Sequence, residues 1–275
     1  TWDYKPALNK RDGSSIGGEG VALGSPFKFS RYGQSGLEVS EVFARTAAHA
    51  DNLAVIRSMW TDIPAHEVAT VFMNTGSLRL AKPSMGSWVV YGLGTENQNL
   101  PGFVVMLDQR GGPISGAKNW SAGYMPATYQ ATVIGSGKTP ILDLDRPEGV
   151  SKEQQRDMLN TLQEYNNDHL SHHVENSNLA ARISSYELAY RMQATAPEAV
   201  DLHSEPEHIK ELYGLNDRRT EVFGRQCLMA RRLVERGVRF IQLFHVGWDT
   251  HGNLIREISM QSEDTDQPTA ALIKD

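Results

Sequence analysis

The stretch Val238-Arg-Phe-Ile-Gln-Leu-Phe244, followed directly by His245-Val-Gly-Trp-Asp-Thr-His251, decides the fold and points to a site. Its first part is a run of β-branched and aromatic residues that predicts a buried strand. In open α/β sheets, ligands bind just beyond the carboxyl ends of strands. The following loop offers His245, Asp249 and His251, and zinc accepts imidazole nitrogen and carboxylate oxygen. The pattern therefore predicts a divalent metal site. The alternative is a surface loop whose histidines hydrogen-bond to backbone.

Working outward, strands and helices alternate at both ends of the chain. Strand-like runs occur at Leu53–Trp60, Ser87–Tyr91 and Phe103–Leu107, and a Gly-, Pro- and Ser-rich excursion runs from Asp108 to Gly149. Helical patterns are expected at Leu37–Ala50, His66–Asn74, from Ser151 with breaks to Gln193, at Glu207–Leu212, at Asp217–Arg236 and at Gln267–Ile273. This order predicts an α/β fold. The expected architecture is a three-layer α/β/α sandwich with a mainly parallel sheet, in one domain over 1–275 with a helical insertion at about 151–215.

Composition excludes several classes of protein. The chain has 275 residues, 40% of them hydrophobic, which is enough for a sizeable core. Its net charge is −6 and its basic residues are scattered, which argues against a nucleic-acid-binding surface. No run of about 18 apolar residues is present to span a membrane. The single cysteine, Cys227, excludes an internal disulfide and falls on the apolar stripe of its predicted helix, where we interpret it as a core residue.

A second candidate for chemistry is His66, in the segment Asp62-Ile-Pro-Ala-His66. It stands at a strand-to-helix transition, where free N–H groups and the helix dipole favour an anionic ligand. An imidazole there could act as nucleophile, general base or metal ligand. Asp62 and Glu67 are possible ligands or partners of His66. The alternative is a histidine that satisfies nearby backbone groups.

Other motifs are weaker. His169, His172 and His173 share a helix face and could bind metal, but Asn166, Asn167 and Asp168 beside them favour a solvated surface. Gly135-Ser-Gly-Lys-Thr139 lacks the first glycine of a phosphate-binding loop, because Thr132 holds that position. Gly92-Leu-Gly94 lacks the third glycine of a dinucleotide fingerprint. These motifs therefore give no support for nucleotide or dinucleotide binding.

Several long strings resemble a known bacterial family. They are Pro83-Ser-Met-Gly-Ser-Trp-Val-Val-Tyr-Gly-Leu-Gly-Thr-Glu-Asn97, Leu100-Pro-Gly-Phe-Val-Val105, Asn119-Trp-Ser-Ala-Gly123 and Trp248-Asp-Thr-His-Gly-Asn253. The family is domain-of-unknown-function family 1501, which is assigned to the alkaline phosphatase superfamily and often labelled sulfatase-like. The resemblance covers nearly the whole chain. It implies an alkaline-phosphatase-like fold, a periplasmic or secreted protein, and a central fragment that lacks the family's first strand and its last metal-ligand stretch.

The resemblance also implies roles for individual residues. The superfamily places its nucleophile nine residues before a Thr-Gly pair, and counting back from Thr75 reaches His66. It supplies metal ligands from loops after strands, which supports His245, Asp249 and His251 as part of a metal site. The metal would be zinc, with manganese, calcium or magnesium as alternatives.

The function implied is metal-dependent hydrolysis of sulfate or phosphate esters, on a small-molecule or polysaccharide substrate. The central fragment implied by the resemblance, residues 1–275, would by itself bind metal weakly and be inactive. The alternative is a non-catalytic exported binding or scaffold protein, because His66 replaces the usual Ser, Thr or Cys. The sequence does not predict the oligomeric state.

Overall fold

A computed structural model describes residues 25–61, 63–78, 82–135, 137, 140–142, 144–173 and 176–275. The chain divides into two compact units. The first comprises Thr1–Pro64, Lys210–Gly224 and Gly247–Asp275, and the second comprises Ala65–Ile209 and Arg225–Val246. Helices α6 (Glu207–Leu212) and α7 (Glu221–Glu235) contain residues of both units.

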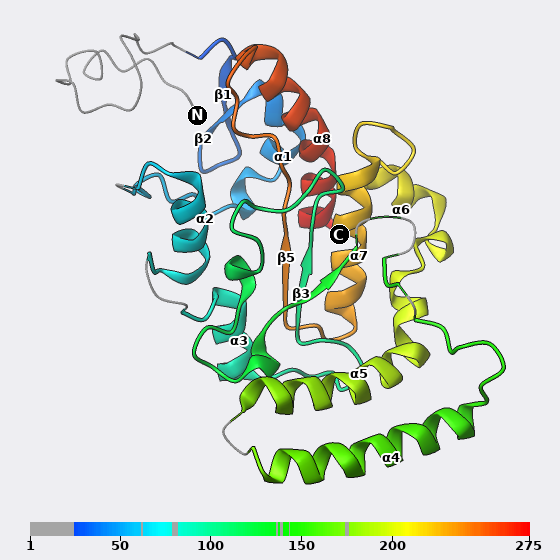
Figure 1. The fold of residues 1–275 in the computed structure, drawn as a ribbon. Coiled ribbons are helices and arrows are strands. Elements are labelled where there is room, and N and C mark those ends of the chain that lie inside the picture. The colour runs from blue at the N-terminus through cyan, green and yellow to red at the C-terminus, as the bar shows by residue number, and fades with distance from the viewer. Residues whose placement is uncertain are drawn as a thin grey trace. The chain divides into compact units, whose positions relative to one another are not determined.

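The second unit contains a parallel sheet in the order β4-β3-β5, formed by Thr132–Ile134, Phe103–Met106 and Phe240–Leu243 (Figure 1). Every residue of β3 is buried, as expected for a strand with a neighbour on each side and cover on both faces. A cluster of buried residues packs around β3 and consists of Val90, Phe103, Val105, Trp120 and Ala131. The mixed α/β class and the parallel sheet are therefore confirmed, and the strand predictions at Phe103–Leu107 and 238–244 are confirmed with them.

Two strand predictions are wrong. Ser87–Tyr91 lies in helix α3, Met85–Leu93, whose buried residues Gly86, Ser87 and Val90 repeat at helical spacing. That face lies so close to Phe103 that a Cβ on Gly86 would be 2.5 Å from the ring. Packing against β3 thus overrides the β propensity of Trp-Val-Val-Tyr. Leu53–Trp60 is irregular, with Val55 and Ile56 exposed and no strand partner among the described residues.

Further short elements complete the sheet region of this unit. Helix α2 spans His66–Thr75 and ends at Gly76, whose φ of 66° is the left-handed conformation that a glycine C-cap supplies. The 3₁₀ helices η4 and η5 span Gly116–Trp120 and Ala127–Tyr129. The predicted helix after Pro64 and its stop signal are therefore confirmed.

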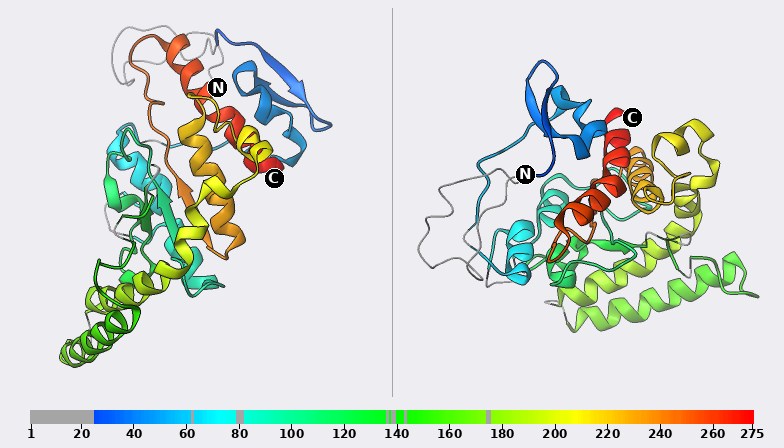
Figure 2. Two further views of the ribbon diagram at one scale, coloured as in Figure 1. Left: turned by 90° about the vertical axis from the view of Figure 1, so that its right-hand side faces the viewer. Right: turned by 90° about the horizontal axis from the view of Figure 1, so that it is seen from above.

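The helical insertion consists mainly of two long helices, α4 (Lys152–Ser171) and α5 (Ser177–Val200), which lie side by side (Figures 1 and 2). A capping box starts α4: Ser151 accepts the N–H of Gln154 and the Gln154 side chain accepts the N–H of Ser151. Arg156 on α4 grips Glu187 on α5 through two hydrogen bonds of 2.6 and 3.1 Å. This bidentate ion pair joins the two helices.

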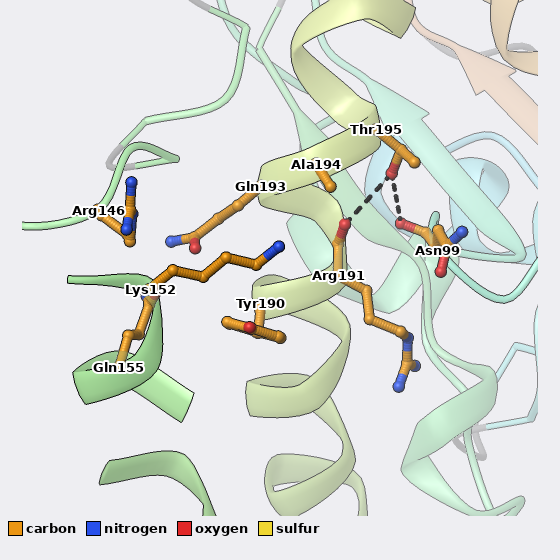
Figure 3. A pocket seen from close by; sticks show the side chains of 9 residues that line it. All are labelled: Asn99, Arg146, Lys152, Gln155, Tyr190, Arg191, Gln193, Ala194 and Thr195. Atoms are coloured by element: carbon orange, nitrogen blue, oxygen red, sulfur yellow. Dashed lines mark hydrogen bonds between the residues drawn. The ribbon is translucent and has the colours of Figure 1, made fainter. Parts of the chain in front are cut away.

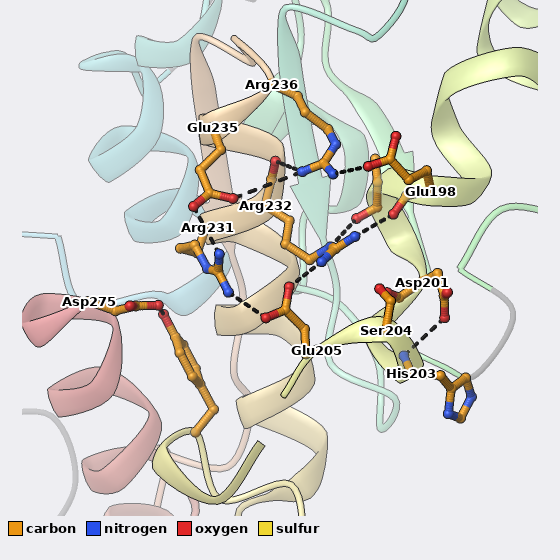
Figure 4. A network of polar contacts seen from close by, with 12 residues as sticks. Glu198, Asp201, His203, Ser204, Glu205, Arg231, Arg232, Glu235, Arg236 and Asp275 are labelled. Carbon is orange, nitrogen blue, oxygen red and sulfur yellow. Dashed lines mark hydrogen bonds and ion pairs between the residues drawn. The ribbon is translucent and has the colours of Figure 1, made fainter. Parts of the chain in front are cut away.

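A network of hydrogen bonds and ion pairs joins arginines of α7 to the end of α5 and to Glu205 (Figure 4). Glu205, which follows η6 (Leu202–Ser204), is buried and accepts hydrogen bonds from Arg231 at 2.8 Å and from Arg232. Arg232 also donates to the carbonyls of Ala199 and Glu198 at 3.0 and 2.6 Å. Cys227 on α7 is buried, and burial raises the pKa of its thiol to about 12. The core interpretation of this cysteine is confirmed.

The first unit is built from a β-hairpin and helices. Strands β1 (Phe29–Tyr32) and β2 (Leu37–Ser40) pair antiparallel, and they are followed by η2 (Glu41–Phe43), α1 (Ala44–Ala47) and η3 (Ala50–Asn52). The helix predicted over Leu37–Ala50 is therefore wrong at its start, where hairpin pairing takes up its first residues. Helix α8, Leu254–Lys274, is much longer than the predicted Gln267–Ile273. None of the described helices is both long and apolar enough to cross a membrane.

A buried carboxylate on α8 holds the start of α1. Asp266 accepts the backbone N–H of Arg45 at 2.9 Å and that of Thr46 at 2.8 Å. Replacing Asp266 with Ala leaves these N–H groups without their acceptors, so we expect the free energy of unfolding to fall by about 2–4 kcal/mol. Urea titration followed by circular dichroism measures this. Asp266→Asn keeps one acceptor oxygen and should lose less; equal losses in the two variants would contradict the capping role.

Candidate functional site

The carboxyl edge of the parallel sheet brings an acid and an imidazole together. Asp108 stands two residues beyond β3 and His245 two residues beyond β5, and the strands pair in register with Met106 opposite Leu243. The ladder continues through a 3.0 Å hydrogen bond from the Phe244 N–H to the Met106 carbonyl. Asp108 and His245 therefore leave the sheet at the same edge, where α/β proteins bind their ligands.

The Asp108 carboxylate is almost fully buried and holds the guanidinium of Arg110. Arg110 donates from Nε at 3.0 Å and from Nη2 at 2.7 Å, and its backbone N–H donates at 2.9 Å. The N–H of Val246 adds a fourth hydrogen bond at 3.1 Å. Burial of the Asp108 carboxyl opposes its ionisation, but the hydrogen bonds from Arg110 and Val246 outweigh burial and lower its pKa. The carboxylate is thus charged at neutral pH and fixes the arginine.

Arg110 in turn contacts His245. Its Nη2 lies 3.0 Å from His245 Nε2 and donates to the Val246 carbonyl at 3.2 Å. A guanidinium can only donate, so Nε2 accepts here and the imidazole is neutral. Nearly half of the Arg110 side chain remains exposed. The edge therefore presents a fixed cationic fork, and the Nε2 of His245 is engaged by that fork.

The other two predicted ligands belong to the first unit and contact each other. Nε2 of His251 lies 2.8 Å from Oδ2 of Asp249, and both side chains are exposed. The preceding residue Trp248 stacks on Phe43 with ring centroids 6.3 Å apart. Gly247 has φ of 102°, and a Cβ there would meet the side chain of Gln261 on α8. The loop is thus held against its own unit while the Asp249–His251 pair faces solvent.

His66 is the first residue of α2 and is exposed. The first turn of α2 is tied to the loop after Arg110, because Ser115 Oγ donates to the Glu67 carbonyl at 2.7 Å. At its other end, Asn74 accepts from Gln242 of β5 at 2.6 Å. Helix α2 is therefore fixed against the sheet, with His66 at its amino terminus. Asp62 lies outside the described residues.

Of the three histidines predicted to share a helix face, His169 lies in the last turn of α4, His172 is its C-cap residue, and His173 follows the helix. The rings of His169 and His173 stack with centroids 4.5 Å apart, and His173 Nδ1 lies 3.0 Å from the His169 carbonyl. His172 Nε2 lies 4.0 Å from Asp168. All three side chains are exposed. Of the segment Gly135–Thr139, which was not expected to bind phosphate, Ser136, Lys138 and Thr139 lie outside the described residues.

Sequence reasoning missed Asp108 and Arg110. Both lie at the start of the Gly-, Pro- and Ser-rich excursion from Asp108 to Gly149, whose composition predicts a loop and marks no individual residue. The signal that could have found them is the one that found His245: a charged side chain directly after an apolar strand. The strand at Phe103–Leu107 was predicted, so Asp108 was within reach of that rule.

The whole chain, residues 1–275, matches the model of a family described as "Protein of unknown function (DUF1501)". The chain belongs to this family. No curated protein and no solved structure matches it. Membership confirms the family part of the resemblance drawn from the sequence, and the chemistry of the site is therefore the basis for any assignment of activity.

Proposed function

We propose that this chain belongs to a metal-dependent hydrolase that cleaves sulfate or phosphate esters, with an alkaline-phosphatase-like three-layer sandwich as its fold. The observation that carries the proposal is the guanidinium of Arg110, gripped by the buried Asp108 at the carboxyl edge of a parallel sheet. A planar guanidinium fork matches the oxygens of sulfate and phosphate groups. The edge is also where such sheets bind ligands. An oxyanion ester therefore suits this position.

The metal ligands in this proposal are His245, Asp249 and His251. Their nitrogen and oxygen donors suit zinc, and manganese, calcium and magnesium are the alternatives. Asp249 and His251 fit this role, because their donor atoms lie 2.8 Å apart and both side chains are exposed. His245 fits after one change: its Nε2 must exchange Arg110 for the ion. A bound divalent ion would polarise the ester oxygens and lower the pKa of a coordinated water.

The chain's own residues then have defined roles. Arg110 binds a non-bridging oxygen of the ester and stabilises the charge that develops there. In hydrolysis, a water oxygen bonds to sulfur or phosphorus, the bond to the alcohol oxygen breaks, and the alcohol leaves with a proton. His66, at the start of α2, acts as nucleophile or as general base. As nucleophile its nitrogen would carry the phosphoryl or sulfuryl group until water removes it.

One observation favours a second function. The contact between Arg110 and His245 engages the imidazole nitrogen that a metal would need. A protein that only binds oxyanions, as a non-catalytic exported binding or scaffold protein, would keep this contact. The two functions differ in whether any ester is turned over.

The decisive experiment assays the full-length protein with 4-nitrophenyl sulfate and 4-nitrophenyl phosphate after chelation and after adding back each metal. We expect nitrophenol release only with metal, and a loss of about 100-fold or more in kcat/KM for Asp249→Ala and His251→Ala. His172→Ala removes an exposed histidine that has no role in the proposed chemistry; it serves as the matched control and should keep full activity. Turnover in the presence of chelator, or full activity in Asp249→Ala, would overturn the proposal. No turnover with any metal would favour the binding protein.

A further inference from the structure

Four aromatic side chains of the second unit are joined into one surface, which we call the aromatic patch: Trp88, Tyr91, Tyr124 and Tyr129. Trp88 lies edge-to-face with Tyr91, with ring centroids 6.2 Å apart, and with Tyr124, at 6.3 Å. Tyr91 lies in the same way against Tyr129, at 5.3 Å. The patch therefore combines rings from α3, from the loop after η4 and from η5.

The rings of the aromatic patch are accessible to solvent. Trp88 is 47% exposed, Tyr91 55% and Tyr124 67%, although each of them contacts another ring. Gly92 follows Trp88 by one turn of α3, and a Cβ at this position would meet no atom within 4 Å. A helical side chain lies over the turn that precedes it, so a glycine here leaves Trp88 uncovered. Contiguous exposed apolar patches often mark binding sites.

Hydrogen bonds fix the backbone under the aromatic patch. The buried hydroxyls of Ser84 and Ser87 lie 3.0 Å apart, and Ser87 Oγ donates to the Ser121 carbonyl at 3.0 Å. The Ser84 N–H donates to the same carbonyl at 3.0 Å, which joins the start of α3 to the loop after η4. The loop after α3 is held by α5, where Thr195 Oγ1 donates to the Asn99 carbonyl at 3.3 Å (Figure 3). A fixed backbone therefore holds the rings in place.

The two segments that carry the aromatic patch are uncharged. Neither Pro83–Thr95 nor Asn119–Gly135 contains Asp, Glu, Lys, Arg or His, although 22% of the residues in the chain are charged. Protein-binding surfaces that are rich in aromatic residues are usually rich in arginine as well. Helices that lie on membranes carry Lys and Arg beside their aromatic residues. The absence of both from these segments favours an uncharged ligand that is neither a protein nor a lipid surface.

We propose that the aromatic patch binds an uncharged polysaccharide. A sugar ring presents C–H groups on its faces and hydroxyl groups around its edge. Aromatic rings pack against the C–H faces, and tyrosine hydroxyls and the indole N–H hydrogen-bond the sugar hydroxyls. Because Tyr91 and Tyr124 both contact Trp88, the patch offers adjacent rings to successive sugar units of one chain. An uncharged polysaccharide thus matches the patch in charge, in apolar surface and in hydrogen-bonding groups.

Affinity electrophoresis of the full-length protein tests this in native gels that contain xylan, glucomannan, mixed-linkage β-glucan or starch. Gels with polygalacturonate or carrageenan provide anionic polysaccharides for comparison. At least one neutral polysaccharide should retard the protein, with a Kd at least about tenfold lower than that of either anionic polymer. Added salt should leave this Kd nearly unchanged, because salt screens interactions between charges.

Variants inside and outside the aromatic patch make the result specific. Trp88→Ala and Tyr124→Ala should each raise the Kd about tenfold or more, because each removes a ring. Gly92→Leu keeps every ring and places a side chain over Trp88, so it should weaken binding as well. Trp60→Ala and Tyr165→Ala remove an exposed tryptophan and an exposed tyrosine elsewhere, and both should bind like the unmodified protein.

The proposal is wrong if no neutral polysaccharide retards the protein, or if an anionic polymer binds as tightly as the best neutral one. It is also wrong if Trp88→Ala, Tyr124→Ala and Gly92→Leu all keep the original Kd, or if the two control variants lose as much affinity. A dimer in size-exclusion chromatography that dissociates in Trp88→Ala would show that a second copy covers the patch instead. If thermal melting shows that Trp88→Ala or Tyr124→Ala is unfolded, the Kd of Gly92→Leu decides. Failure of ester hydrolysis leaves these binding results unaffected, so the two proposals fail separately.

Discussion

Replacing Arg110 with Ala should lower kcat/KM for aryl sulfate or aryl phosphate hydrolysis by about 10²–10³-fold. The guanidinium is fixed by two hydrogen bonds to a buried carboxylate, so its position does not depend on the substrate. A donor fixed in this way stabilises the charge that grows on the ester oxygens in the transition state. Its loss should therefore appear mainly in kcat. Steady-state kinetics on the full-length, metal-loaded protein measures the change.

Two further variants make this result specific. Arg110→Lys keeps the positive charge but loses the planar fork, so we expect an intermediate activity. Arg182→Ala removes an exposed arginine elsewhere in the same unit and should leave kcat/KM unchanged. Added guanidinium at low concentration should restore part of the activity of Arg110→Ala. If Arg110→Ala retains half or more of the activity, the guanidinium has no role in the reaction.

Replacing Glu205 with Ala should lower the free energy of unfolding by about 3–5 kcal/mol. Glu205 is buried and is the shared acceptor for the guanidinium groups of Arg231 and Arg232. Without it, Arg232 remains buried with its charge uncompensated by a carboxylate at that position. Arg231 keeps a second partner, Glu235, at 2.9 Å. The penalty should therefore come mainly from Arg232, and chemical denaturation measures it.

The same carboxylate gives the stability a pH dependence. Burial opposes ionisation of Glu205, but hydrogen bonds and charges from Arg232 and Arg231 outweigh it and lower its pKa below the ordinary value of 4.5. A group whose pKa is lower in the folded state contributes stability above its unfolded pKa and loses it as the pH falls through the folded pKa. Stability should thus fall below about pH 4.5, and less steeply in Glu205→Gln. If the free energy of unfolding falls equally steeply with decreasing pH in the unmodified protein and in Glu205→Gln, this prediction is wrong.

Much of the sheet and its surroundings could be predicted from sequence. The strands at Phe103–Met106 and Phe240–Leu243, the helix from His66 and its end at Gly76 followed from local patterns, because apolar runs and stop signals are short-range. Helix α3 could not be predicted this way. Its Trp-Val-Val-Tyr run has strand propensity, and its packing against Phe103 of β3 overrides that propensity. Tertiary packing decides such segments.

In the candidate site, too, the local features could be predicted from the sequence and the long-range contacts could not. His245, Asp249 and His251 could be found because they follow a strand directly and lie within seven residues. The hydrogen bond between Asp249 and His251 is a local consequence of that spacing. The engagement of His245 by Arg110 was not predictable, since it depends on two strands that are adjacent in space and 135 residues apart at these positions. Pairing between distant strands leaves no local signature.

The two side-chain hydrogen bonds from Arg110 to Asp108 change the conformational entropy that is lost when an anion binds. A free arginine side chain samples many rotamers, and freezing it costs roughly 2 kcal/mol. Here that cost is met during folding, when the buried carboxylate immobilises the fork. An anion arriving at the sheet edge would lose its own freedom of motion but would not have to order the arginine. Preorganisation of this kind favours tight association even for a ligand as small as a single ester group.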